Sequence, residues 1–78
     1  MKVLVEVMLK NGVLDSQGRA VHRALEGMGF SGIKDLRVGK TYELDLDDSV
    51  TDDEIVSMCQ KQLVNSVIER YHVTRLTG

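Results

Sequence analysis

An alternating run of apolar side chains near the middle of the chain most strongly limits its possible folds. The run occupies only even-numbered positions, and its members are Leu36, Val38, Tyr42, Leu44 and Leu46. A two-residue turn at Gly39 and Lys40 would turn Glu43 onto the apolar face, because successive side chains of a strand point to opposite faces. The parity therefore excludes a two-residue hairpin at this point.

Two arrangements satisfy the parity. One is a three-residue hairpin, and the other is a single long, bent strand with a bulge at Gly39, since glycine within a strand often marks a bulge. A continuous strand over 33–46 would extend about 40 Å, which is longer than a domain of this size can cover. The long strand would have to pair with a second copy of the chain.

Strands are also predicted at both ends of the chain. The first segment places apolar side chains on one parity, at Val3, Val5, Val7 and Leu9, and the segment 67–73 alternates in the same way. Such alternation is typical of a strand with one buried face.

Two helices are predicted between the strands. Asp15 can cap the first, and Gly29 can end it in the left-handed conformation. Thr51 and Glu54 form a capping box at the start of the second, and Asn65 is its expected left-handed end.

The order of these elements predicts an α+β fold. We expect a single domain over 1–78 with a β-α-β(β)-α-β sheet related to the ferredoxin-like pattern and two helices on one face. With one Phe, two Tyr and no Trp, the core must be mainly aliphatic. A domain this small is marginally stable alone, so oligomerisation is a natural way to bury more surface.

Charge and hydropathy exclude several classes of partner. The formal charge of −2 provides no basic field for phosphate backbones, so no nucleic acid is expected. No apolar run approaches the ~20 residues that span a bilayer, so no membrane is expected either. Cys59 is the single cysteine, which fits a reducing, cytoplasmic compartment.

The sequence offers little chemistry of its own. Cys59 lies on the apolar stripe of the second helix and is interpreted as a core residue rather than a nucleophile. His22 and His72 lack neighbours at metal-ligand spacing and are interpreted as surface or interface residues. We therefore predict no catalytic residue, no cofactor site and no metal site in this chain.

Two loops could instead contact a ligand or partner. Arg37, Gly39 and Lys40 combine two cations with a glycine, which could hold an anion, although no helix is predicted to begin there. The segment Gly12–Gly18 exposes side chains suited to a protein contact, since loops held between rigid elements often carry recognition.

Three segments in this order and spacing strongly resemble the PurS family, the small subunit of phosphoribosylformylglycinamidine synthase. They are Gly12-Val13-Leu14-Asp15-Ser16-Gln17-Gly18, Leu36-Arg37-Val38-Gly39-Lys40 and Leu63-Val64-Asn65-Ser66-Val67-Ile68-Glu69. Family members often have proline where this chain has Ser16 and Ser66, and serine fills both positions without steric conflict.

The resemblance implies a segment-exchanged homodimer that can pair further into a homotetramer. It also implies a non-catalytic subunit of a glutamine-dependent ligase, in which a large synthetase subunit uses ATP and magnesium and a glutaminase subunit releases ammonia. The expected partner-interface residues are Val13, Leu14, Asp15, Gln17, Arg37, Gly39, Lys40 and Asn65. The alternative is a stand-alone regulatory dimer that binds a small ligand at its interface.

Overall fold

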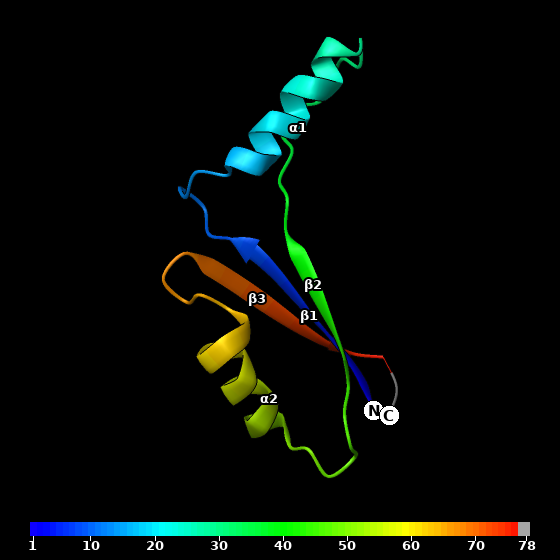
Figure 1. The fold of residues 1–78 in the computed structure, drawn as a ribbon, viewed down its shortest axis with the longest axis vertical. Helices are drawn as coiled ribbons and strands as arrows, with labels where there is room; N and C mark the ends of the chain where they lie inside the picture. The colour runs from blue at the N-terminus through cyan, green and yellow to red at the C-terminus, as the bar shows by residue number, and fades with distance from the viewer. Residues whose placement is uncertain (77–78) are drawn as a thin grey trace.

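The computed structural model describes residues 1–76 as a three-stranded sheet with two helices (Figure 1). In chain order the elements are β1 (Lys2–Leu9), α1 (Ser16–Gly27), β2 (Lys40–Asp45), α2 (Asp52–Met58), the π-helical turn η1 (Cys59–Leu63) and β3 (Glu69–Arg75). The α+β prediction is confirmed.

The sheet has the order β2-β1-β3, and both outer strands run antiparallel to β1. Val5 lies opposite Tyr42 of β2 and opposite Val73 of β3. The alternating apolar side chains of all three strands therefore lie on the same face of the sheet. This shared register follows from the alternation in the sequence, because a slip by one residue would move every apolar side chain to the opposite face.

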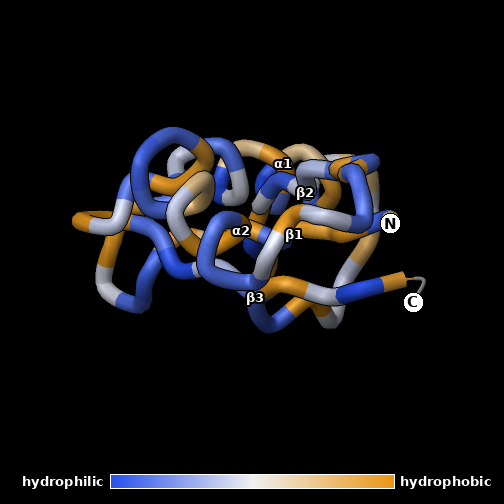
Figure 2. Tube along the Cα trace, turned by 90° about the horizontal axis from the view of Figure 1, so that it is seen from below, coloured by the Kyte–Doolittle hydropathy of each residue, from blue (hydrophilic) through white to orange (hydrophobic). Residues whose placement is uncertain are grey.

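The core lies between this face of the sheet and α2. It consists of three valines of β1, which are at most 1% exposed, one residue of α2, one of η1 and the residue that follows η1: Val3, Val5, Val7, Ile55, Cys59 and Val64. No polar or charged residue of the described chain is buried. Figure 2 shows apolar and hydrophilic segments interleaved along the trace, as expected for a thin layer with one covered face.

The first helix does not cover the sheet. Figure 1 shows α1 extending past the end of β1, with the segment 28–39 running back beside it, and the molecule measures 50 × 26 × 15 Å. We call residues 16–39 the arm. The only buried residue of α1 is Gly18, while Met28 and Phe30 are 71% and 59% exposed. The expectation that both helices lie on one face is therefore wrong for the isolated chain, whose core contains no residue of α1.

The segment 33–46 does not fold back on itself. Only Lys40–Asp45 forms a strand, and residues 33–39 continue away from the sheet without pairing to any strand of residues 1–76 (Figure 1). The three-residue hairpin is therefore wrong. The long-strand alternative agrees with the path of the chain, although its first half lacks a pairing strand.

The predicted helix caps are confirmed, with one exception. Asp15 accepts a hydrogen bond from the Gly18 amide, Gly29 has a φ of 94°, and Thr51 accepts from the Glu54 amide at 3.2 Å. The prediction for Asn65 is wrong, because no residue of 1–76 other than glycine has a positive φ.

Asn65 instead organises the loop before β3. Its side-chain oxygen accepts a hydrogen bond from the Val67 amide at 3.2 Å, and its carbonyl oxygen accepts from the Ile68 and Glu69 amides at 3.1 and 2.8 Å. Asparagine commonly forms such turns through its side chain. Asn65 therefore stabilises the turn before β3 without adopting the left-handed conformation.

Candidate partner-binding site

The base of the arm is where residues 10–15 leave the sheet and residues 36–40 return to it. Asp15 joins these two segments, because its Oδ1 accepts from the Gly18 amide at 2.8 Å and its Oδ2 accepts from the Val38 amide at 2.9 Å. The Val38 and Gly18 amides, followed by the charge of Arg37, lower the pKa of Asp15 from its ordinary value of 3.8. Asp15 therefore both caps α1 and holds the returning segment 36–40 in place through the Val38 amide.

These contacts predict a pH-dependent contribution of Asp15 to stability. Because the pKa is lower in the folded chain, the contribution is complete above the unfolded value of 3.8 and is lost as the pH falls through the folded value. We expect Asp15→Asn to lower the urea midpoint at neutral pH, with the gap from the parent protein closing in acid. Asp53→Asn, which alters an exposed aspartate in the first turn of α2, is the control. An equally wide gap in acid would refute this assignment.

Arg37 fastens the same two segments from a second position. Its guanidinium donates to the Asn11 side-chain oxygen and the Leu9 carbonyl oxygen, both at 2.8 Å, and to the Lys10 carbonyl oxygen at 3.3 Å. A planar guanidinium can donate several hydrogen bonds in a fixed geometry. Arg37 therefore acts mainly within the chain, as a tie between the turn after β1 and the arm.

Two glycines permit the close approach of backbone at this point. A Cβ at Gly39 would lie 2.5 Å from the Val7 carbonyl oxygen, and a Cβ at Gly18 would lie 3.0 Å from the Leu36 carbonyl oxygen. A Cβ does not pack 2.5 Å from a carbonyl oxygen, so Gly39 is required for this geometry, and at Gly18 an added Cβ would also collide with the Asp15 carboxylate that caps α1.

An open pocket of about 310 Å³ lies beside the base of the arm. Its lining combines apolar and charged side chains from β1, the start of α1, the returning segment and β3: Val7, Leu9, Leu14, Asp15, Ser16, Gln17, Val38, Gly39, Lys40 and Glu69. Leu14 is 64% exposed and provides an apolar surface at the rim. A partner could bury this side chain beside fixed charges, which is a common composition for a protein interface.

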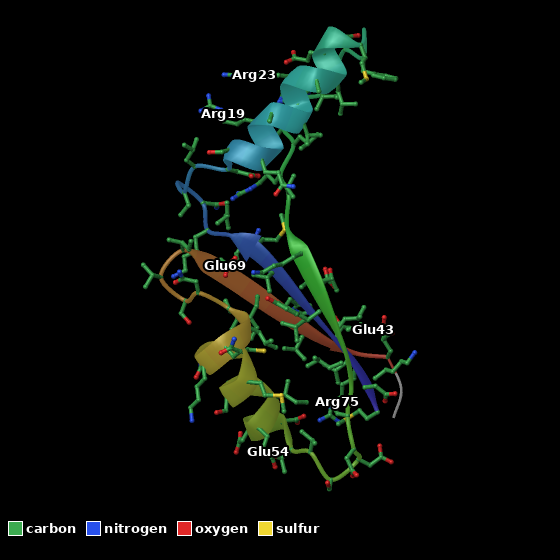
Figure 3. All side chains as sticks on the ribbon, viewed as in Figure 1. Arg19, Arg23, Glu43, Glu54, Glu69 and Arg75 are labelled. Carbon is green, nitrogen blue, oxygen red and sulfur yellow. The ribbon has the colours of Figure 1, made fainter. Side chains whose placement is uncertain are left out.

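The charges of the pocket are paired within the chain. Lys40 Nζ lies 3.7 Å from Glu69 Oε2, and Glu69 Oε1 accepts from the Asn65 amide at 2.8 Å. The interaction of Lys40 with Tyr42, followed by the Glu69 carboxylate, raises the pKa of Lys40. Glu69, labelled in Figure 3, thus links β2 to the loop before β3.

Most of the interface residues predicted from the sequence lie in or beside the pocket at the base of the arm. Leu14, Asp15, Gln17, Gly39 and Lys40 line the pocket, and Asn65 is connected to it through Glu69. Val13 lies in the adjoining turn, where its amide donates to the Lys10 carbonyl oxygen, and Arg37 is engaged by the turn after β1. Glu69 was not among the predicted interface residues, although its charge at an apolar-parity position of the last strand was a signal for it.

The remaining candidates for chemistry lie outside the pocket lining. Cys59 is completely buried, and the loss of solvent raises the pKa of its thiol. The ring Nε2 of His22 lies 3.0 Å from the Ile33 carbonyl oxygen, within the arm, and His72 is exposed on β3. Residues 1–76 contain no group of three or more His, Cys, Asp or Glu placed to hold a metal ion. Across the same residues, every helix is too short or too polar to cross a membrane.

Comparison with known proteins identifies the family. Residues 2–77 match the family model described as PurS, phosphoribosylformylglycinamidine (FGAM) synthase. The chain belongs to the PurS family. It is 43% identical over 74 residues to the PurS subunit of Mycobacterium leprae, covering 95% of this chain and 94% of the relative. It is 46% identical over 72 residues to the Bacillus subtilis subunit, with 90% and 86% covered.

Solved PurS structures share the fold. The Methanocaldococcus jannaschii PurS crystal structure superimposes with a TM-score of 0.82 at 32% identity, covering 94% of this chain and 92% of that one. A chain of the structure of PurLQS from Thermotoga maritima superimposes with a TM-score of 0.80 at 32% identity, covering 96% and 95%. PurS is a subunit of FGAM synthase, an enzyme of purine biosynthesis.

Proposed function

We propose that this chain is the non-catalytic small subunit that connects the synthetase and glutaminase subunits of FGAM synthase in the cytoplasm. The full-length family match carries the proposal, together with the likeness to a chain of the T. maritima PurLQS assembly. The pocket at the base of the arm offers shape and an exposed apolar rim rather than a reactive group. A structural role in the assembly agrees with these features.

In this proposal the chemistry belongs to the other subunits. The whole enzyme converts formylglycinamide ribonucleotide, ATP and glutamine to formylglycinamidine ribonucleotide, ADP, phosphate and glutamate. The large subunit uses ATP and magnesium to activate the amide oxygen of the substrate, and the glutaminase subunit releases ammonia with its own cysteine. The small subunit holds the two together so that ammonia passes within the assembly instead of dissolving as ammonium.

We further propose that two copies exchange their arms. Residues 33–39 form no helix and pair with no strand of residues 1–76, and the outer edge of β2 is not paired with any strand of these residues either. If the arm of a second copy lay along this edge, its α1 could cover the sheet beside α2, and Met28 and Phe30 would lose their exposure. Each copy would then have both helices on one face, as the sequence pattern predicts. Such a homodimer could pair further into a homotetramer.

We assign the partner contact to the pocket at the base of the arm. Leu14 provides exposed apolar area there, and the hydrogen bonds of Asp15 and Arg37 fix the backbone around it. A small-ligand site is the alternative use of this pocket. We favour a protein partner because Asp15, Lys40 and Glu69 already have polar partners within the chain, which leaves the ligand little to bind.

The test of the proposed function compares two nitrogen sources. The matching large and glutaminase subunits are assayed for formylglycinamidine ribonucleotide, with and without this chain, using either glutamine or ammonium chloride. We expect glutamine-driven synthesis to require the chain and ammonium-driven synthesis to proceed without it. If neither reaction depends on the chain, the connecting role is refuted, and a thermal shift with an amino acid or nucleotide would then test the regulatory alternative.

The same assay tests the partner surface. Leu14→Asp places a charge at the apolar rim, and we expect about tenfold weaker assembly with the other subunits, or roughly 1.4 kcal/mol, with little change in folding. Ser49→Asp adds the same charge in the exposed loop after β2, at the opposite end of that strand. Assembly is measured by sedimentation of the mixed subunits. Equal effects of the two variants would remove the pocket from the interface.

A further inference from the structure

The turn before β3 presents the most exposed large apolar side chain of residues 1–76. Val67 is 81% exposed, and its neighbour Ile68 is 38% exposed. Figure 1 shows this turn projecting from the body of the molecule between η1 and β3. A single exposed apolar residue is common on protein surfaces, so exposure alone does not indicate a contact. The backbone that carries Val67 is what sets this residue apart.

Hydrogen bonds hold the turn from both sides. The Asn65 carbonyl oxygen accepts from the Ile68 amide at 3.1 Å, and the Asn65 side chain accepts from the Val67 amide at 3.2 Å. From β1, the Lys10 ammonium group donates to the Ser66 carbonyl oxygen at 2.7 Å, and the Lys10 amide donates to the Ile68 carbonyl oxygen at 2.8 Å. The turn is therefore organised by its backbone, while the valine at its tip remains free for a contact outside the chain.

The turn is continuous with the pocket at the base of the arm. Glu69 lines that pocket, and the same carboxylate accepts from the Asn65 amide at 2.8 Å. Lys10, which holds the turn, also accepts at its carbonyl oxygen from the amide of Val13, the residue before Leu14. The exposed side chain of Leu14 and the turn are therefore fastened to the same end of the sheet.

The exposed charges beside the turn are positive. The register of β1 and β3 places Lys10 opposite Ile68, and Arg70 follows Ile68 by two positions on the strand. The Arg70 side chain is exposed and makes no hydrogen bond or ion pair within residues 1–76. Glu69 is 16% exposed and is already engaged within the chain, so it does not balance these cations. A complementary surface would combine an apolar hollow with carboxylates at its rim.

We infer that Val67 is an anchor of the partner interface and enters an apolar pocket of the same subunit that covers Leu14. Carboxylates at the rim of that pocket face Lys10 and Arg70. A side chain that is held in position before binding loses little conformational freedom on association, which favours affinity. This role of Val67 rests on the proposed function and extends it from the pocket to the turn.

A second copy of the chain has its own place in the assembly. Arm exchange uses the edge of β2, which lies on the other side of β1 from β3 and its turn. The turn also presents cations and apolar side chains without an exposed carboxylate, so two copies of it are not complementary to each other. These features favour a different protein as the occupant.

Photo-cross-linking in the complete assembly identifies what contacts the turn. The photo-reactive residue p-benzoylphenylalanine replaces Val67, Leu14 or Ser49 in turn, and each chain is mixed with the large and glutaminase subunits before irradiation. We expect positions 67 and 14 to cross-link to the same subunit. Position 49, in the exposed loop after β2, is the control and is expected to give little product. Cross-links from 67 to the other subunit, to a second copy or to nothing would overturn the inference.

A charge at the tip of the turn tests the energetic contribution of Val67. We expect Val67→Asp to weaken assembly with the other subunits about tenfold in sedimentation, since it prevents burial of a valine. Its melting temperature should equal that of the parent protein, because the side chain is exposed. If Val67→Asp assembles as well as Ser49→Asp, the anchor role is wrong although the connecting function stands. If the parent chain itself does not assemble, the proposed function and the anchor role are both refuted.

A proline in the turn tests whether its fixed backbone matters. No hydrogen bond of residues 1–76 uses the Ser66 amide, and no residue of the turn has a positive φ, so proline fits this second position of the turn. We expect Ser66→Pro to tighten assembly about two- to fivefold. Asn65→Ala removes the side-chain bond to the Val67 amide and is expected to weaken assembly. Unchanged or weaker assembly of Ser66→Pro would overturn the preorganised anchor.

Charge reversal beside the turn tests the chemistry of the partner surface. We expect Arg70→Glu to weaken assembly about two- to fivefold, with a smaller effect at high salt, because it places a carboxylate against carboxylates. Arg23→Glu makes the same change on α1, where Figure 3 shows the side chain pointing away from the sheet. Equal effects of the two variants would exclude an acidic rim around the bound Val67.

Discussion

Replacement of Val5 by aspartate is expected to leave the chain unfolded at neutral pH. Val5 is completely buried at the centre of β1, between Tyr42 and Val73, in a core that has six buried residues. An unpaired carboxylate at this position costs several kcal/mol, since no buried polar group of the described chain can bind it. A chain of 78 residues has a total stability of about 4–12 kcal/mol, so this penalty is comparable with the whole.

Glu6→Asp is the matched control for this prediction. It places an aspartate at the next position of the same strand, where the side chain is exposed on the opposite face. We expect the control to retain the circular dichroism spectrum and cooperative thermal transition of the parent protein, while Val5→Asp loses both. A cooperative transition in Val5→Asp would show that the valine face of β1 is not the core.

Replacement of Gly39 by alanine is expected to destabilise the chain by about 1–3 kcal/mol. The added methyl group would lie 2.5 Å from the Val7 carbonyl oxygen and would also collide with the Met8 side chain. Met8 can move, but the carbonyl belongs to the central strand, so the returning segment must shift away from β1. The denaturant midpoint measures the loss, and hydrogen exchange of the Val38 amide reports whether its bond to Asp15 opens.

Gly27→Ala is the control for the alanine substitution. A Cβ at Gly27 meets no atom within 4 Å, and the residue ends α1, where alanine favours the helix by up to about 1 kcal/mol. We expect unchanged or slightly higher stability. If Gly39→Ala behaves in the same way, the close approach of the arm to β1 is not a constraint on the fold.

Local signals in the sequence predicted most of the fold. The aspartate before α1 and the threonine before α2 cap their helices as expected, because a cap depends only on residues three positions away. The parities of the three strands predicted their buried faces, and the central valines became the core. The α+β class followed from these elements and their order.

The placement of the arm was not predictable from the same signals. The periodicity of α1 shows that one side of the helix requires apolar contacts, but it does not specify whether the same chain or a second copy supplies them. The parity around Gly39 left both a three-residue hairpin and a long strand open, and the structure excludes the hairpin. Asn65 illustrates a similar limit, since asparagine stabilises several kinds of turn and the sequence does not select one.

The candidate site was predicted as a set of residues rather than as a geometry. Five interface residues were predicted in two separate loops, and the structure places all five in the lining of one pocket: Leu14, Asp15, Gln17, Gly39 and Lys40. Arg37 was expected to bind an anion or partner, and that stays a prediction, while its hydrogen bonds to the turn after β1 were not predicted. Glu69 was not predicted because its role comes from two tertiary contacts, an ion pair with Lys40 and a hydrogen bond from the Asn65 amide. Lys40 lies far from Glu69 in the sequence.

The sequence by itself determined the order of the elements, the N-terminal caps of both helices, the buried face of each strand and the resemblance to PurS. Each of these depends on side chains within a few positions of one another or on an ordered pattern of residues. Only the tertiary structure decided that the arm leaves the sheet, that Asp15 fastens Val38, and that Glu69 joins Lys40 to Asn65. The physical reason is that these contacts join segments far apart in the chain, and their geometry depends on how the whole backbone packs.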